Sequence, residues 1–226
     1  MSYTVYGLLF GLFIPYLARR FSKFMPATPA YALYRIFKPV KSVRSEKKKA
    51  NPLYQKLMRR YRMRSVGWGI VCAALSGLAD AHFGTGHIVW NLAFIWTLLL
   101  LSEIDNRMFL LPDILTVPLL IAGYAFAVFA GAWAGPAESS LGAAAGYLLP
   151  VAASVFFVWK HKDVFGGGDI KLLAAAGAWL GLENILYVVI LASLLFGVYS
   201  LLRRQRCGAF GPSIAAAAIM IAFYNF

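Results

Sequence analysis

The chain has 226 residues, of which 61% are hydrophobic and only 14% are charged, and its formal net charge is +13. This composition excludes an ordinary soluble domain and predicts a membrane protein. The chain has two cysteines, no CxxC pair and three scattered histidines, so it offers no ligand set typical of a structural zinc site.

Apolar runs recur along the whole chain, and a helix of about 20 apolar residues crosses a bilayer. We predict an all-α polytopic membrane protein with about eight transmembrane helices. Their expected ranges are 3–18, 66–81, 88–101, 114–133, 141–159, 170–182, 185–202 and 209–226. Three parts follow: a first helix (1–20), a basic cytoplasmic loop with an amphipathic segment (21–65), and a transmembrane domain of about seven helices (66–226).

The basic residues predict the orientation of these helices. Of the 22 lysines and arginines, 15 lie between Arg19 and Arg64. If this segment is cytoplasmic and the chain crosses eight times, every other basic residue also falls on the cytoplasmic side, as the positive-inside rule favours. Both termini are then extracytoplasmic. We therefore expect a multi-pass protein of the cytoplasmic (inner) membrane.

The basic loop favours a lipid partner over nucleic acid. Basic clusters beside a membrane span commonly contact anionic headgroups. Within the loop, residues 53–63 place Leu53, Leu57 and Tyr61 on one helical face and the basic residues elsewhere. This pattern predicts a short helix lying in the membrane surface. We expect anionic lipids as partners and no nucleic acid.

The stretch GGGDIK, residues 166–171, places an aspartate directly after three glycines at the start of an apolar run. A carboxylate at a span end is a functional candidate, because charge near hydrocarbon is costly. Glycine permits close approach of another backbone, which would suit an extended peptide beside Asp169. The alternative is a flexible turn in which Asp169 caps the following helix, and the motif alone leaves both interpretations open.

A second group of carboxylates lies at the same predicted face, in the stretch SEIDNRMFLLPD (102–113). Pro112 is well placed to open a helix, and Asp113 in its first turn would suit the helix dipole. Asp105 has no such structural explanation. Asp163, beside Lys162, is typical of a solvated loop charge.

Two carboxylates that face each other cannot both ionise cheaply, so one keeps a proton near neutral pH. Such a pair can deprotonate a water molecule with one member and protonate a carbonyl or leaving amine with the other. Peptide hydrolysis then needs neither a metal nor a covalent intermediate, and no metal-ligand cluster or serine or cysteine triad competes for this role.

Three motifs in order, IDNRMFLLPDILTVP, FGGGDIKLLAAAGAWLG and AFGPSIAAAA, resemble the type IV prepilin peptidase family of GxGD aspartyl proteases. The resemblance covers about residues 98–226, so the domain 66–226 would be the peptidase domain. It implies that Asp105 and Asp169 are the catalytic pair. The supporting residues that it implies are Asp113, Gly166, Gly168, Lys171, Gly211 and Pro212.

The resemblance implies an endopeptidase that removes the basic leader from prepilins or pseudopilins at the cytoplasmic face, without a cofactor for the peptidase reaction. Many family members carry two CxxC pairs in the loop after the first helix and also methylate the new amino terminus with S-adenosylmethionine. That loop, here about 21–65, contains no cysteine, which argues against methyltransferase activity. A different interpretation is a proton-coupled transporter that uses intramembrane carboxylates; a third is a structural subunit.

Overall fold

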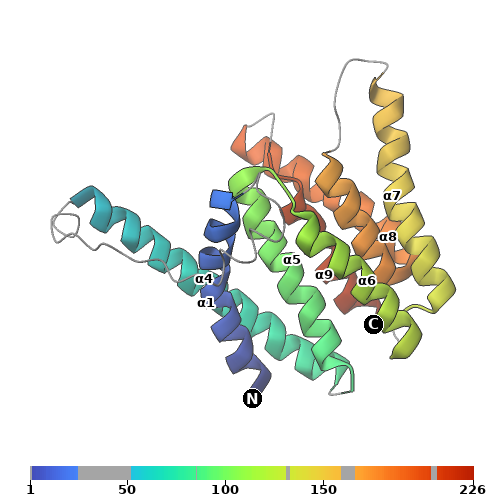
Figure 1. Cartoon of the computed structure of the whole chain (residues 1–226), viewed down its shortest axis with the longest axis horizontal. Helices are drawn as coiled ribbons and strands as arrows, with labels where there is room; N and C mark the ends of the chain where they lie inside the picture. Colours follow the sequence, from blue (N-terminus) through green and yellow to red (C-terminus); the bar gives the residue numbers. More distant parts are fainter. Residues whose placement is uncertain (1, 25–51, 85, 131–132, 159–165, 205–207) are drawn as a thin grey trace. The chain divides into compact units, whose positions relative to one another are not determined.

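The computed structural model describes residues 2–24, 52–84, 86–130, 133–158, 166–204 and 208–226. These ranges are helical and contain no β-strand, which confirms the all-α prediction. Figure 1 shows the helices in chain order. They are α1 (Ser2–Phe24), α4 (Pro52–Phe83), α5 (Ile88–Met108), α6 (Asp113–Phe129), α7 (Pro136–Val158), α8 (Gly167–Arg203) and α9 (Gly211–Asn225).

The chain divides into two compact units, Met1–Ala81 and His82–Phe226. In the first unit α1 packs against α4 through small residues. A Cβ at Gly7 would meet the carbonyl oxygen of Cys72 at 2.6 Å, so only glycine allows this approach. The hydroxyl of Ser65 donates a hydrogen bond to the carbonyl oxygen of Leu12 at 2.5 Å, which ties the two helices together further along.

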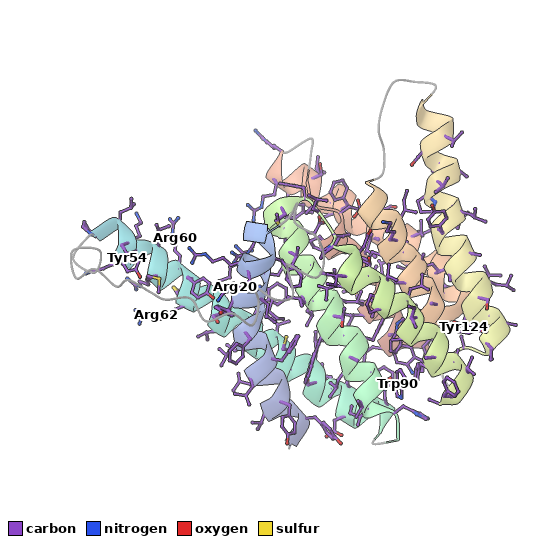
Figure 2. The ribbon with its side chains drawn as sticks, in the orientation of Figure 1. Arg20, Tyr54, Arg60, Arg62, Trp90 and Tyr124 are labelled. Atoms are coloured by element: carbon purple, nitrogen blue, oxygen red, sulfur yellow. The ribbon has the colours of Figure 1, made fainter. Side chains whose placement is uncertain are left out.

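Helix α4 corrects the expectation of a separate surface helix at 53–63, because one continuous helix of 32 residues includes both that segment and the next predicted span. At about 1.5 Å per residue it is roughly 48 Å long, well beyond a hydrocarbon core of about 30 Å. Its amino-terminal part is exposed, and Figure 2 shows Arg60 and Arg62 on opposite sides of it. The rest of the predicted loop, 25–51, lies outside the described residues.

The second unit is built around the first half of α8. Every residue from Leu172 to Gly181 is buried, and α8 packs against α6, α7 and α9. Trp179 anchors this core: its ring stacks on Phe94, and its indole N–H donates to the carbonyl oxygen of Leu119 at 2.8 Å. A polar N–H buried among rings thereby has an acceptor, as burial requires.

Helix α8 contains a break at Gly181, where φ is 83° and ψ is 177°. This backbone conformation is strained for any residue with a Cβ and routine for glycine. The break separates two helical stretches that correspond to the predicted spans 170–182 and 185–202. The pattern of apolar residues therefore located both stretches, although the structure joins them without an intervening loop.

Two described helices of the second unit approach closely through glycines. A Cβ at Gly142 on α7 would lie 2.6 Å from the carbonyl carbon of Gly181, and one at Gly146 would lie 2.7 Å from that of Leu173. A Cβ at Gly177 would overlap the backbone of Gly142. Glycines four positions apart on a membrane helix can also form a contact surface for a substrate helix. In this structure they pack α7 against α8, as small residues commonly do in membranes.

We expect Gly177→Ala to destabilise the protein by about 1–3 kcal/mol, the usual cost of overpacking a tight contact. The added methyl group has no space, because backbone atoms of Gly142 and Ala143 face it. Gly197→Ala, in the second half of α8, is the matched control, since a Cβ there meets nothing within 4 Å. Detergent-induced unfolding of both variants measures the difference. Equal stability of the two would contradict the packing described here.

Three of the described helices are long and apolar enough to cross a membrane, namely α4, α5 and α8. Two shorter apolar helices, α6 and α9, accompany them. The membrane character of the chain is thus supported, while the number of eight crossings and the placement of the termini stay predictions.

Candidate functional site

Asp105 lies in the last turn of α5 and is only 4% exposed. The predicted span ended at residue 101, whereas α5 continues to Met108 and so places Asp105 inside the helix. Phe109 ends the helix in the left-handed conformation, and its amide donates to the carbonyl oxygen of Asp105 at 2.8 Å. A well-formed helix end therefore holds the backbone that carries the Asp105 side chain.

The amino terminus of α9 meets this side chain directly. The backbone amide of Gly211 donates a hydrogen bond to Oδ2 of Asp105 at 2.8 Å. A Cβ at position 211 would lie 2.7 Å from the same oxygen, so the contact requires glycine. Pro212 stands in the first turn of α9, where its fixed φ suits a helix start. The resemblance implied that Gly211 and Pro212 support the site. For Gly211 the structure shows one contact that can do so, its hydrogen bond to Asp105.

Asp169 lies in the first turn of α8, and its amide donates to the carbonyl oxygen of Gly166 at 3.0 Å. The capping residue is Gly166, and it makes no side-chain cap. Asp169 is therefore not the N-cap residue itself, but its carboxylate interacts with the backbone of Gly166, so a helix-capping role stands beside the functional one. A Cβ at Gly166 would lie 3.2 Å from Oδ2 of Asp169, so the carboxylate is close to the backbone that precedes it.

The glycines before Asp169 differ in their surroundings. A Cβ at Gly168 would lie 2.9 Å from the Cβ of Leu111 and 3.3 Å from its amide nitrogen, so Gly168 packs on the segment between α5 and α6. A Cβ at Gly167 meets nothing within 4 Å. The chain's own backbone thus occupies the space beside Gly168, which the sequence suggested for a peptide, and the open side of the turn is at Gly167.

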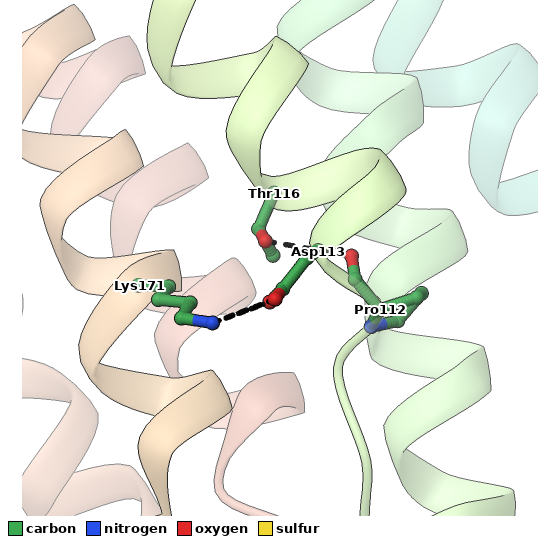
Figure 3. Close-up of polar contacts among 4 residues, drawn as sticks. All are labelled: Pro112, Asp113, Thr116 and Lys171. Atoms are coloured by element: carbon green, nitrogen blue, oxygen red, sulfur yellow. Dashed lines mark hydrogen bonds and ion pairs between the residues drawn. The ribbon is translucent and has the colours of Figure 1, made fainter. Parts of the chain in front are cut away.

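Asp113 is the first residue of α6, directly after Pro112, as predicted. Both of its carboxylate oxygens accept hydrogen bonds from Nζ of Lys171 at 2.7 Å, and Figure 3 shows this pair bridging α6 and α8. Both side chains are largely exposed, so the ion pair itself contributes little stability, about 0–1 kcal/mol. Its main effect is to link the beginning of α8, which also carries Asp169, to the start of α6.

Asp105 and Asp169 lie near enough to interact electrostatically. Among the residues that the structure describes, no hydrogen bond joins the two carboxyl groups, and no cluster of three or more potential metal ligands is found. Acid and base catalysis of hydrolysis needs two such carboxylates close enough to act on one water molecule and one carbonyl group. Asp163 lies outside the described residues.

The sequence motifs did not single out Glu103, which is completely buried. Nε of Arg107 donates to its carboxylate at 2.7 Å. The two residues are one turn apart on α5, and this spacing of opposite charges was the signal available in the sequence. Residues two positions apart on a helix do not face each other, so the pair supports the end of α5 on a side away from the Asp105 carboxylate.

The described residues thus define a helical membrane protein that gathers two carboxylates from separate helices at the starts of α8 and α9. Residues 92–201 match the type IV leader peptidase family model. The matched residues include both aspartates, the LPD element and the GGGDIK stretch. The resemblance inferred from the motifs is confirmed.

Relatives named prepilin leader peptidase/N-methyltransferase include a protein of Aeromonas salmonicida, 40% identical over 56% of this chain and 46% of its own length. Another, from Pseudomonas aeruginosa, is 38% identical over 66% of this chain and 54% of its own length. The chain therefore spans about half the length of the relatives it matches. No solved structure matches it. These names support the peptidase interpretation and give no support to the transporter alternative.

Proposed function

We propose that this protein is a membrane aspartyl endopeptidase that cleaves the basic leader peptide from prepilins or pseudopilins at the cytoplasmic face of the inner membrane. The observation that carries the proposal is the approach of Asp105 and Asp169, two carboxylates from different helices that interact electrostatically within the family-matched region. Each carboxylate lies against a glycine backbone, that of Gly211 for Asp105 and that of Gly166 for Asp169.

The proposed reaction divides the work between the two aspartates. One carboxylate accepts a proton from water as the water oxygen attacks the scissile carbonyl carbon. The other carboxyl group protonates the carbonyl oxygen. Asp113 and Lys171 bind each other and hold the starts of α6 and α8 together, so in this proposal they support the site without entering the chemistry.

The substrate peptide would approach on the open side of the GGG turn. A methyl group on Gly167 would meet no atom within 4 Å, whereas Gly168 contacts Leu111. A substrate peptide lying against Gly167 would contact the chain two positions before Asp169. A further hypothesis is that the GGG stretch acts as a hinge that closes the pair when substrate binds, because the two carboxyl groups are not hydrogen-bonded to each other in this structure.

The direct test is cleavage of a membrane-embedded prepilin by the reconstituted protein, followed by identification of the new amino terminus by mass spectrometry. Cleavage immediately before the apolar helix of the substrate would support the proposal. An intact substrate, with a correctly folded enzyme and an active relative as positive control, would overturn it.

The same assay tests methylation. We expect the product made in the presence of S-adenosylmethionine to carry no methyl group on its new amino terminus, because residues 21–65 contain no cysteine for the zinc-bearing element. A mass increase of one methyl group, dependent on S-adenosylmethionine, would contradict this expectation. The relative from Aeromonas salmonicida, whose name includes N-methyltransferase, is a suitable comparison.

We further propose that the amino-terminal part of α4 binds anionic lipid headgroups. The five basic residues of this exposed segment are Lys56, Arg59, Arg60, Arg62 and Arg64. Since α4 is longer than a bilayer core, its basic end can stand at or beyond the headgroups, where each basic residue contributes about 1 kcal/mol of attraction to an anionic surface. The neighbouring apolar residues Leu53 and Leu57 are also exposed and can enter the interface.

An environment-sensitive fluorophore at position 57 of the reconstituted protein measures this contact. We expect a blue shift in vesicles that contain anionic lipid, and its loss at high salt because of screening. Replacement of Arg59, Arg60 and Arg62 by glutamine should remove the shift. Identical spectra in neutral and anionic vesicles would contradict the lipid proposal and leave the peptidase proposal untouched.

A further inference from the structure

The Asp105 carboxylate completes the amino terminus of another helix. The first amides of any helix lack partners within that helix. In α9 the capping residue Phe210 supplies no side-chain acceptor, and its carbonyl oxygen accepts the amides of Ser213 and Ile214. The amide of Gly211 instead donates to Oδ2 of Asp105 on α5. Asp105 thus serves as the cap that α9 does not have in its own sequence.

This contact favours negative charge on Asp105. A helix amino terminus carries partial positive charge, and a hydrogen bond from N–H to a carboxylate is stronger than one to a neutral acid. At 4% exposure Asp105 has little water around it, so an ionised carboxylate there depends on such a donor. The buried donor and the helix end offset part of the cost of burial.

The ionisable groups around Asp105 are few in the described part of the chain. On α8 the neighbour is Asp169, and a charged Asp105 makes a second negative charge there costly. On α5 itself, Glu103 is paired with Arg107. On α6, Asp113 is paired with Lys171, and α9 has no ionisable side chain before Tyr224. Asp169 also has a backbone amide near its carboxylate, that of Gly166 at the start of α8. Of the two carboxylates, however, Asp105 is the one that accepts a hydrogen bond from a different helix, at 2.8 Å, and this bond distinguishes it from its partner.

We infer that the amino terminus of α9, acting through the Gly211 amide, holds Asp105 as the ionised member of the pair, so that Asp105 is the base and Asp169 the acid. This inference rests on the proposed peptidase function. Gly211 is a positioning residue in this proposal, because it acts through its contact with Asp105. Its lack of a side chain is required, because a Cβ would lie 3.1 Å from both Cβ and Cγ of Asp105.

The proton balance follows from this assignment. Asp105 accepts a proton from water while the water oxygen bonds to the scissile carbonyl carbon, and Asp169 gives its proton to the carbonyl oxygen. On collapse, the carbon–nitrogen bond breaks and Asp105 delivers its proton to the leaving amine. Asp169 recovers its proton from the intermediate's hydroxyl, so the pair returns to its starting state.

The sharpest test removes the Gly211 N–H without adding a side chain. Cys207, four residues upstream, allows ligation of a synthetic carboxyl-terminal segment in which an ester replaces the amide at Gly211. The matched control is an ester at Ile214, whose amide bonds Phe210 in the same turn and does not contact Asp105. A second variant, Gly211→Ala, can be made by ordinary expression and displaces the carboxylate sterically.

We expect the Gly211 ester to shift the acidic limb of the pH profile of kcat/KM upward by about one to two pH units. At a pH below the shifted limb, kcat/KM should fall about ten- to hundredfold, the effect of losing one hydrogen bond to a charged group. The basic limb should stay in place, and the Ile214 ester should move neither limb. Gly211→Ala should shift the same limb in the same direction.

Three outcomes would overturn the inference. A uniform loss of kcat/KM at all pH values would give Gly211 a merely structural role. Movement of the basic limb of the profile would make Asp105 the acid. An unchanged profile would show that the Gly211 amide has no role in the reaction. The wild type must cleave in this assay and Asp105→Asn must not. If the wild type does not cleave, the peptidase proposal fails; if Asp105→Asn cleaves, the assignment of Asp105 to the catalytic pair fails. Both outcomes are distinguishable from a failure of this inference alone.

Discussion

Asp105→Asn and Asp169→Asn are each expected to abolish prepilin cleavage, with a loss of at least about 10²- to 10⁴-fold in kcat. Asparagine keeps the shape of each side chain, and its carbonyl oxygen can still accept the Gly211 amide at position 105. It cannot accept a proton from water or donate one as a carboxylic acid does. Because both residues act in one step, the double variant should be about as active as either single variant.

Asp113→Asn is the matched control for these two substitutions. Asp113 is 60% exposed in its side chain and binds Lys171, so its loss should weaken only the link between α6 and α8. We expect substantial activity in this variant. The measurement is initial rate in reconstituted membranes, with folding checked by unfolding in detergent. An inactive Asp113→Asn together with an active Asp105→Asn would move the catalytic pair to Asp113 and contradict the assignment.

Gly168→Ala should lower kcat by about tenfold or more, because its methyl group must push the start of α8 away from Leu111. Asp169 is the next residue, so it would move with the helix. A displacement of about 1 Å in catalytic geometry can cost about 10²-fold. The KM should change less than kcat, since the displaced group acts in the chemical step.

Gly167→Ala tests the same chemical change one residue earlier, where the added methyl group has open space. With a short substrate that ends near the cleavage site, we expect Gly167→Ala to have a nearly normal kcat. If Gly167→Ala were as slow as Gly168→Ala, glycine flexibility would explain the result better than the contact with Leu111. If neither variant were slower than the wild type, the packing of Gly168 would have no catalytic consequence.

Sequence patterns predicted the helical membrane class, most helix positions and the motif residues of the site. Helix periodicity and hydropathy act locally, so Pro112 could be placed before a helix and Asp113 in its first turn. The end of α5 was missed because a charged stretch, with Glu103 and Asp105, reads as the end of an apolar span. In the structure Arg107 neutralises Glu103, and the helix continues beyond both carboxylates.

Contacts between distant segments could not be predicted from the sequence. Gly168 and Gly211 were recognised as motif positions, but only the structure pairs Gly168 with Leu111 and Gly211 with Asp105. A glycine at a motif position can provide flexibility, form a turn or allow another segment to approach the backbone closely, and the sequence looks the same in all three cases. The three-dimensional neighbours decide among them.

The hydrogen bond between Asp105 and Gly211 joins residues that are 106 positions apart in the chain. During synthesis, α5 and α8 emerge from the ribosome before α9, so a partly made chain holds both aspartates without the amide that completes Asp105. Hydrolytic competence would then arise only when the last described helix enters the membrane. On the proposed assignment, the order of translation would delay formation of the complete site until the other described helices are already in place.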